Sequence, residues 1–431
     1  MLKDIRQRLK PAFFCGLHGA TAVAPLQDNG SSRRRRSGLC MLALTAALLP
    51  LVVTGCWRKH FPHYPADFRE YAWVTNSGGN SVTVLDLVHM QTAATIAVGD
   101  DPTDVAVSPT RDEVYVVNTG SGSVSVIDAV TNKVAATIGV HREPDSISVE
   151  ASGARAYVAN AGSNNVSVVD LAKRREAGAV GVGESPGVVR VAPDGATLVV
   201  TNRKSGSVSV VDAEKLRVRA VFDGCPGAAD AVILPDSSKA FVACTGGHQV
   251  MALGLARAQA QDPAEHKDRL LALLDVGPTP THLALKPDGG EIFVSNFGGD
   301  TVSEIATGTN EVGGAYTVGE NPLGGVVTAD NSTLWVSNYG ANTVAAYSID
   351  DGTLINRGIQ VGEGPGPLAL TSDGFLLLAV DREAGDVSVL RTISYTPKGV
   401  AVTGSLFTVL SAGRKPDAIA VKSFVVGARS R

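Results

Sequence analysis

Aromatic residues, cysteine and recognisable catalytic motifs are scarce in this sequence. Only 5% of the 431 residues are aromatic, and five are cysteine. The chain has no C-x-x-C-H motif for covalent haem, no Gly-Lys-Ser/Thr phosphate-binding loop and no His-Glu-x-x-His zinc motif. It also has no serine in a G-x-S-x-G elbow between a strand and a helix. Because these motifs are absent, none of them indicates a reaction. The function has to be sought in other features of the sequence.

Positive charge is scarce beyond the first 55 residues. Those residues hold eight of the 38 Lys and Arg and only two of the 42 Asp and Glu, so the rest of the chain holds 30 basic and 40 acidic residues. Non-specific binding to DNA or RNA needs several cationic contacts to phosphates. We therefore expect no nucleic-acid partner.

One short phrase recurs along the chain. A strand-like apolar segment ends at a polar residue or cysteine eight times, at Asn76, Asn118, Asn160, Asn202, Cys244, Asn296, Asn338 and Asp381. The intervals are 42, 42, 42, 42, 52, 42 and 43 residues, and the long one contains a polar insertion at Ala256–Arg269 that belongs on a loop. A nearly constant period of this length predicts a repeat architecture.

Each repeat carries four strand signals. A first strand follows a Gly-x-x-Pro turn, a Pro/Asp/Gly turn leads to the second, and a polar turn separates the second from a third strand such as Ser123–Asp128. Four antiparallel strands in 42 residues predict one blade of a β-propeller. The eight innermost strands would begin near Pro102, Pro144, Pro186, Ala228, Pro280, Pro322, Pro365 and Pro416.

The two ends of the repeat region predict how the ring closes. The first copy, from Tyr71, lacks an innermost strand, whereas Lys415–Ser423 is an innermost strand with nothing after it. Pairing of Ala418 and Ile419 with Trp73 and Val74 would complete the first blade. We predict an all-β, eight-bladed propeller over residues 71–423, with seven blades as the alternative.

With its YVxN strands, the chain resembles the YVTN-repeat β-propellers from about Tyr71 to Ser423. The resemblance implies an extracytoplasmic or cell-surface protein. Familiar members have seven blades, so the eighth blade departs from the family pattern and weakens any transfer of function.

The N-terminal region has the three parts of a bacterial export signal. A basic run at Arg33–Arg36 precedes an apolar segment from about Leu39 to Val53, and small residues come before Cys56. The apolar segment is short for a membrane span and contains Pro50. The sequence predicts a signal region at residues 1–55, a tether at 56–70 and a C-terminal tail at 424–431.

The stretch Val53-Thr54-Gly55-Cys56 resembles the lipobox of bacterial lipoproteins. The resemblance implies cleavage before Cys56 and acylation of that residue, and each buried CH₂ would contribute ~0.8 kcal/mol to membrane binding. An ordinary secretory signal that happens to end at a cysteine is the alternative. We expect an envelope lipoprotein at the outer membrane, the periplasmic face or the cell surface.

The recurrent Asn and Asp residues have a structural interpretation. An Asn at a strand end can bond its own backbone and adopt a left-handed conformation. Asp86, Asp128, Asp170 and Asp212 fall ten residues after an Asn and are expected to cap the outer hairpin. One copy in each blade would scatter around the ring and would not converge on a site.

Residues that break the repeat are the candidates for function. Glu304 occupies a strand position between blades that is otherwise Val or Ala, and Arg190 replaces a small residue on an innermost strand. Asp230 and His282 share one repeat position in adjacent blades, so they could meet at the channel mouth as a proton-transfer pair. Asp104 has the same position, which makes Asp104, Asp230 and His282 weak metal candidates. For all of these, a structural polar contact is the alternative.

Cys225 and Cys244 fall on the two sides of one predicted inner hairpin. Export favours oxidation, so a disulfide is the leading interpretation. Two free buried thiols, or a metal site that includes His248, are the alternatives.

We expect a lipid-anchored propeller that binds an envelope protein, a polysaccharide or a small ligand, and we predict no cofactor. Acidic turns such as Val98–Asp104 would favour a cationic partner or merely keep the surface soluble. The alternative is a periplasmic propeller enzyme or cofactor-binding protein, similar to lactonase-like, quinone-cofactor or haem-binding propellers, with its site at the channel mouth. Propeller enzymes assemble sites from single residues on many blades, so missing motifs do not decide between the two.

Overall fold

The computed structural model describes residues 64–257, 263–396 and 399–427. The signal region, with Arg33–Arg36 and Cys56, lies outside the described residues. No helix among the described residues has the length and apolar character needed to cross a membrane.

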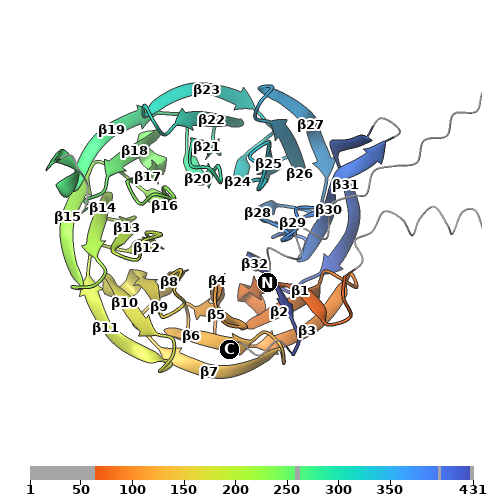
Figure 1. Ribbon diagram of the computed structural model, residues 1–431, viewed down its shortest axis with the longest axis horizontal. Coiled ribbons are helices and arrows are strands. Elements are labelled where there is room, and N and C mark those ends of the chain that lie inside the picture. The colour runs from red at the N-terminus through yellow and green to blue at the C-terminus, as the bar shows by residue number, and fades with distance from the viewer. Residues whose placement is uncertain (1–63, 258–262, 397–398, 428–431) are drawn as a thin grey trace, which may run out of the picture. The chain divides into compact units, whose positions relative to one another are not determined.

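The described strands form eight four-stranded antiparallel sheets arranged in a ring, as the sequence predicts, and each sheet is one blade (Figure 1). Blades 1 and 2 comprise β1 (Phe68–Asn76), β2 (Ser81–Asp86), β3 (Gln91–Ala97) and β32 (Pro416–Val425), then β4 (Pro102–Val107), β5 (Glu113–Asn118), β6 (Ser123–Asp128) and β7 (Lys133–Gly139). Blades 3 and 4 comprise β8 (Pro144–Val149), β9 (Arg155–Asn160), β10 (Asn165–Asp170) and β11 (Arg175–Gly181), then β12 (Pro186–Val191), β13 (Thr197–Asn202), β14 (Ser207–Asp212) and β15 (Arg217–Asp223).

The other four blades repeat the order. Blades 5 and 6 comprise β16 (Ala228–Ile233), β17 (Lys239–Cys244), β18 (Gln249–Gly254) and β19 (Arg269–Asp275), then β20 (Pro280–Leu285), β21 (Glu291–Asn296), β22 (Thr301–Ala306) and β23 (Glu311–Thr317). Blades 7 and 8 comprise β24 (Pro322–Val327), β25 (Thr333–Asn338), β26 (Thr343–Ser348) and β27 (Thr353–Gln360), then β28 (Pro365–Leu370), β29 (Leu376–Asp381), β30 (Asp386–Thr396) and β31 (Gly399–Ser411). Short 3₁₀ turns are η1 (Ser77–Gly79), η2 (Ala161–Ser163), η3 (Thr245–Gly247) and η4 (Pro263–His266).

The ring closes through the last strand. β32 pairs antiparallel with β1 and places Ala420 opposite Trp73 and Ile419 opposite Val74. This confirms the predicted closure and eight blades in place of seven. The first strand begins at Phe68 and the last ends at Val425, slightly outside the predicted bounds of 71 and 423.

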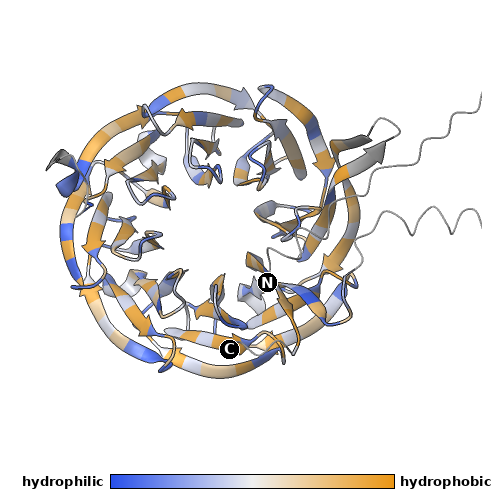
Figure 2. Cartoon of the chain, in the orientation of Figure 1, coloured by the Kyte–Doolittle hydropathy of each residue, from blue (hydrophilic) through white to orange (hydrophobic). Residues whose placement is uncertain are grey.

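The core lies between neighbouring blades. Trp73 and Val84 of blade 1 belong to one buried cluster with Val114 and Val116 of blade 2. Small β-branched side chains suit this geometry, because each sheet is covered on both faces by its neighbours. Hydrophilic residues gather in the loops that join the strands (Figure 2).

The recurrent Asn has a different role from the predicted one. Asn118 is fully buried, and its Nδ2 donates to Ser123 Oγ at 3.1 Å and Ser125 Oγ at 3.0 Å on the next strand. Its counterpart Asn76 has an extended backbone with φ −122°, so the predicted left-handed conformation is wrong for it. The left-handed residue comes four positions later, at Asn80 with φ 49°.

The turn glycine explains why this Asn fits. A Cβ on Gly99 would lie 2.7 Å from Asn118 Cγ, closer than real Cβ contacts come. The same close approach joins Gly183 to Asn202 and Gly277 to Asn296. In these three blades the absence of a side chain on the turn glycine lets the turn lie directly over the amide.

The predicted caps at the outer hairpin are confirmed. Asp128 Oδ1 accepts the backbone N–H groups of Val130 at 3.0 Å and Thr131 at 2.8 Å. Asp86 and Asp212 make equivalent bonds. These acids are used in turns and scatter around the ring.

Candidate functional site

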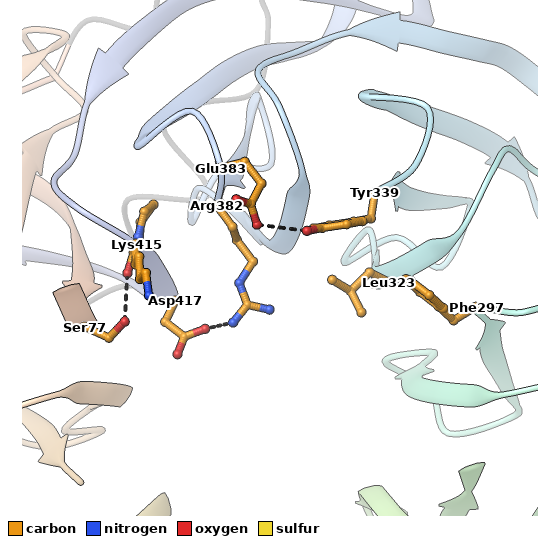
Figure 3. A pocket seen from close by; sticks show the side chains of 9 residues that line it. Ser77, Phe297, Leu323, Tyr339, Arg382, Glu383, Lys415 and Asp417 are labelled. Carbon is orange, nitrogen blue, oxygen red and sulfur yellow. Dashed lines mark hydrogen bonds and ion pairs between the residues drawn. The ribbon is translucent and has the colours of Figure 1, made fainter. Parts of the chain in front are cut away.

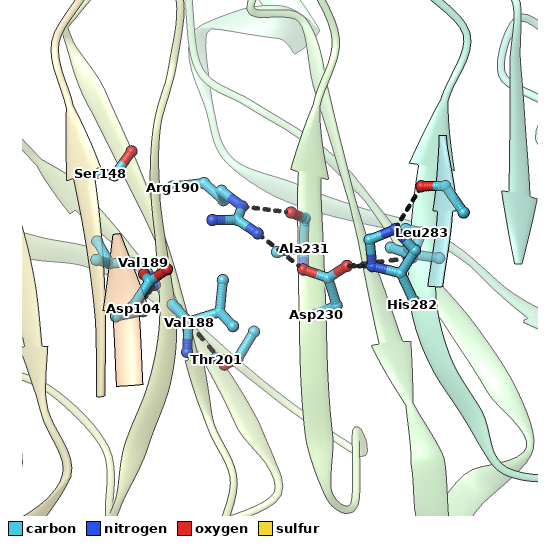
Figure 4. A network of polar contacts seen from close by, with 12 residues as sticks. Asp104, Ser148, Val188, Val189, Arg190, Thr201, Asp230, Ala231, His282 and Leu283 are labelled. Atoms are coloured by element: carbon cyan, nitrogen blue, oxygen red, sulfur yellow. Dashed lines mark hydrogen bonds and ion pairs between the residues drawn. The ribbon is translucent and has the colours of Figure 1, made fainter. Parts of the chain in front are cut away.

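Three of the predicted candidates form one network on the channel wall (Figure 4). Arg190 on β12, Asp230 on β16 and His282 on β20 come from the innermost strands of three successive blades. Arg190 Nη2 lies 3.1 Å from Asp230 Oδ1, and His282 Nδ1 lies 3.0 Å from Asp230 Oδ2. Arg190 Nε also donates to the carbonyl of Ala231 at 3.0 Å. The network therefore links three blades.

Backbone groups also bind the Asp230 carboxylate. Its Oδ1 accepts the N–H of Ala231 at 2.8 Å, and its Oδ2 accepts the N–H of Leu283 in the next blade at 3.1 Å. Asp104 in blade 2 makes the same contact to the next blade, accepting the N–H of Ile147 at 2.9 Å. Side chains at this repeat position thus join neighbouring blades, which is a structural role.

His282 has both ring nitrogens engaged by acceptors. Nδ1 faces the Asp230 carboxylate, and Nε2 lies 3.0 Å from the carbonyl oxygen of Gly325. A carbonyl only accepts, so both nitrogens must carry protons. Burial works against that charge, but the hydrogen bond and charge of Asp230 outweigh it and raise the pKa of His282.

The pKa of Asp230 moves the opposite way. Burial alone would raise it, but the hydrogen bond and charge of His282, together with Arg190, hold the pKa of this carboxyl well below its usual range. Both shifts favour the charged pair over the neutral one. An imidazolium whose two N–H groups are both donated is not a general base and offers no lone pair to a metal or a haem iron.

Asp104 and Glu304 do not join this network. Blades 3 and 4 separate Asp104 from Asp230, and burial, partly offset by backbone hydrogen bonds and by the charge of Arg190, raises the pKa of Asp104 to about 6. Glu304 lies on β22, two strands outward from β20, and accepts a hydrogen bond from Tyr316 Oη at 2.8 Å. Within residues 64–257, 263–396 and 399–427, no group of three His, Cys, Asp or Glu could hold a metal ion.

Cys225 and Cys244 form a disulfide in the structure, with their Cα atoms 4.7 Å apart. Their separation of 19 residues equals that of Gly99 and Asn118, so the disulfide takes the place of the Gly–Asn contact seen in blades 2, 4 and 6. His248 is engaged elsewhere, since its Nδ1 accepts the N–H of Thr279 at 3.2 Å. Both sulfurs are used in the bond, which leaves no thiolate for a metal site.

A pocket of about 490 Å³ opens where the innermost strands begin, at the channel mouth (Figure 3). Blades 6, 7, 8 and 1 contribute to it. Its lining residues are Ser77, Phe297, Leu323, Tyr339, Arg382, Glu383, Lys415, Pro416 and Asp417. The volume lies within the usual range for small-molecule sites, about 300–1,000 Å³.

One wall of the pocket is apolar and the other is charged. The rings of Phe297 and Tyr339 lie 6.2 Å apart, with Leu323 on the same side. On the opposite side, Arg382 pairs with Asp417 across the seam between blades 8 and 1. Figure 3 shows the two walls facing each other.

Hydrogen bonds and glycines fix these side chains. Tyr339 Oη donates to Glu383 Oε1 at 2.9 Å, and this bond raises the pKa of Tyr339, so the hydroxyl stays protonated. A Cβ on Gly366 would lie 2.8 Å from Arg382 Cδ, and one on Gly364 would lie 2.8 Å from Glu383 Cγ. The absence of side chains at Gly364 and Gly366 therefore makes room for the charged wall.

The sequence reasoning missed this pocket, although the repeat contains a signal for it. The residue directly after each recurrent Asn lies at the mouth. In chain order these residues are Ser77, Thr119, Ala161, Arg203, Thr245, Phe297, Tyr339 and Arg382. Three successive large residues at the end of that series mark the pocket.

The similar proteins come from the comparison with solved structures. No family model matches the chain, and no curated protein sequence matches it. Among solved structures, the chain is similar to the hydrazine synthase of Kuenenia stuttgartiensis, with 22% identity and a TM-score of 0.52 over 74% of this chain and 92% of that chain.

Two further structures are similar to the chain. The dihydro-haem d1 dehydrogenase NirN, in complex with DHE, shows 15% identity and a TM-score of 0.63 over 86% of this chain and 78% of that chain. A functionally unknown protein from Desulfotomaculum acetoxidans shows 14% identity and a TM-score of 0.52 over 81% and 98%. At these identities the likeness shows the propeller fold alone.

Proposed function

We propose that this protein is a binding module of the bacterial cell envelope, which is anchored through an acylated Cys56 and holds a ligand in the mouth pocket. The pocket is the observation that carries the proposal. It combines apolar rings with fixed donors and acceptors, which is how proteins bind and orient small ligands. The export signal, the lipobox and the likeness to YVTN-repeat propellers support the envelope location.

The channel network supports binding over catalysis. Arg190, Asp230 and His282 use their polar atoms on one another and on backbone groups of the next blade. A proton-transfer pair needs a nitrogen or oxygen that can exchange a proton near neutral pH. The hydrogen bonds of Asp230 and His282 already occupy the atoms that would exchange a proton, and the lowered pKa of Asp230 moves that carboxyl away from this condition.

Pocket-dependent capture tests the binding role. Full-chain protein would be purified in detergent, immobilised and exposed to an envelope extract of its own host, and retained material would be identified by mass spectrometry and sugar analysis. We expect Arg382→Ala to lose a component that the unaltered protein retains. Arg203→Ala is the matched control, because Arg203 has the same repeat position and pairs with Asp145 at 2.7 Å outside the pocket. Equal retention by all three proteins would overturn the proposal.

The anchor has a separate test. We expect labelled palmitate to enter the unaltered chain and not Cys56→Ser, and the variant to move from the membrane fraction to the soluble fraction. Membrane retention of an unlabelled Cys56→Ser protein would exclude acylation of this residue as the anchor. That result would leave the pocket-binding role standing.

A further inference from the structure

We propose that the mouth pocket binds a neutral saccharide, with one face of a sugar ring on Phe297, Leu323 and Tyr339 and the hydroxyl groups on the charged wall. This inference rests on the proposed binding role and names the class of ligand. Three features of the pocket carry it: the apolar wall, the cancellation of charge on the opposite wall, and the mixture of donors and acceptors there.

The apolar wall fits the C–H face of a sugar ring. Phe297 and Tyr339 are partly exposed, and their rings are tilted by 48° with centroids 6.2 Å apart. Two tilted rings and the Leu323 side chain form a shallow surface from two neighbouring blades. Tyr339 adds a polar tip at the edge of that surface, so a ligand with an apolar face and a polar rim is favoured.

The charged wall carries no net charge. Arg382 and Lys415 are balanced by Asp417 and Glu383. A simple anion would meet both carboxylates, and a simple cation would meet the guanidinium and the ammonium. A neutral ligand avoids both repulsions, so electrostatics favour an uncharged polar molecule.

Donors and acceptors lie side by side on this wall. Asp417 pairs with Arg382 through Oδ1, and Glu383 accepts the Tyr339 hydroxyl through Oε1. A carboxylate accepts about four hydrogen bonds and a guanidinium donates five, so each group keeps capacity for a ligand. A sugar hydroxyl both donates and accepts, and therefore matches this alternation. These planar groups are also already fixed by their mutual bonds, which lowers the ordering cost of binding.

Titration with defined neutral sugars tests the inference. Full-chain protein in detergent would be titrated with maltotetraose, cellotetraose and chitotetraose, with tetragalacturonate and tetralysine as charged probes. Saturation-transfer difference NMR and calorimetry would report binding. We expect at least one neutral tetramer to bind with a Kd of about 1 mM or tighter, and neither charged probe to bind better.

Variants locate the bound sugar. Phe297→Ala and Tyr339→Ala should each weaken binding about tenfold, whereas Tyr339→Phe, which keeps the ring, should change it by less than about threefold. Thr245→Ala is the matched control, since Thr245 has the same repeat position in blade 5 and lies outside the pocket. Unchanged thermal unfolding would show that the variants are folded.

The outcomes separate the ligand class from the binding role. Failure of every neutral tetramer to bind, or binding that Phe297→Ala and Tyr339→Ala leave unchanged, would overturn the saccharide inference. If Arg382-dependent capture from envelope extract persists in that case, the binding role survives with another ligand. If that capture is also lost, both proposals fall.

Discussion

The two halves of the channel mouth follow the same repeat but present different chemistry. In blades 2, 3 and 5 the residue after the recurrent Asn or Cys is small, namely Thr119, Ala161 or Thr245. Blade 4 has Arg203, which lies against Gly187 and pairs with Asp145. In blades 6, 7 and 8 the same position holds Phe297, Tyr339 and Arg382, which line the pocket.

The comparison separates two kinds of exception to a repeat. An exception that faces a neighbouring blade must be compensated by partners, as Asp230 is by Arg190 and His282. An exception at the mouth can also be paired, as Arg382 is with Asp417, but that carboxylate is 23% exposed, against 8% for Asp230. Exceptions between blades hold the ring together, and exceptions at the mouth are available for a ligand.

The largest loss of stability is expected when the ion pair on the channel wall is broken, and breaking the ion pair at the mouth should cost less. Asp230→Ala should lower the free energy of unfolding by about 3–5 kcal/mol, because Arg190 would keep its charge without this partner in a partly buried site. The charged form of His282 would also lose its stabilising carboxylate, and the N–H of Leu283 would lose its acceptor. Asp417→Ala should lower the same free energy by about 1 kcal/mol or less, because the more exposed Asp417 pairs with Arg382, whereas the buried Asp230 is shared by two cations. Urea unfolding of the full chain measures both. Equal losses would contradict the division between the two kinds of exception.

The disulfide offers a second comparison, between blade 5 and its neighbours. Cys225→Ser with Cys244→Ser should lower the free energy of unfolding by about 3 kcal/mol, as expected for a loop of this length. Cys225→Gly with Cys244→Asn rebuilds the Gly–Asn contact of blades 2, 4 and 6 and should recover part of that loss. A rebuilt variant no more stable than the serine variant would show that blade 5 cannot accept the repeat pair.

Blade 8 differs from the others in a way that makes stability depend on pH. Asp381 is fully buried at the position of the recurrent Asn, and burial, together with the nearby Asp386 carboxyl, raises its pKa to about 7. The folded protein therefore holds this proton to higher pH than the unfolded chain does. The resulting contribution to stability is complete below about pH 4 and is lost as the pH rises towards about 7.

Asp381→Asn removes that titration and restores the repeat residue. We expect the variant and the unaltered protein to differ little at pH 4, and the variant to be more stable by about 3 kcal/mol at pH 8, because the ionised Asp381 carboxylate is then buried beside Asp386. Thermal unfolding between pH 4 and pH 8 gives the two curves. Parallel curves across that range would contradict the assignment to Asp381.

Most of the fold could be predicted from the sequence, because each repeat contains the signals for its four strands in order. The regular intervals set the number of blades, and the unmatched segments at Tyr71 and Lys415 set the closure. The contact of Asp230 with His282 could also be expected, since equal repeat positions in adjacent blades are neighbours. The role of Asn118 could not, because its partners depend on how a fully buried strand end meets the next strand.

The pocket was harder to predict for two physical reasons. Most of its residues lie in turns, where the alternation of apolar and polar residues gives no information about the direction of a side chain. The Arg382–Asp417 pair also joins blade 8 to the last strand, so these side chains become neighbours only when the ring closes. A search of the repeat for its most variable solvent-facing position would have found Phe297, Tyr339 and Arg382.

The smallest change in stability is expected at Glu304. This exception to the repeat is neither part of the ion-pair network between blades nor part of the mouth pocket. It is half-buried and has one partner, the Tyr316 hydroxyl at 2.8 Å. Glu304→Val restores the usual repeat residue, so it loses a hydrogen bond worth about 1 kcal/mol and gains apolar burial of similar size. Unfolding in urea should therefore shift by less than about 1 kcal/mol. A loss above about 2 kcal/mol would place Glu304 with Asp230, among the exceptions that hold the ring together.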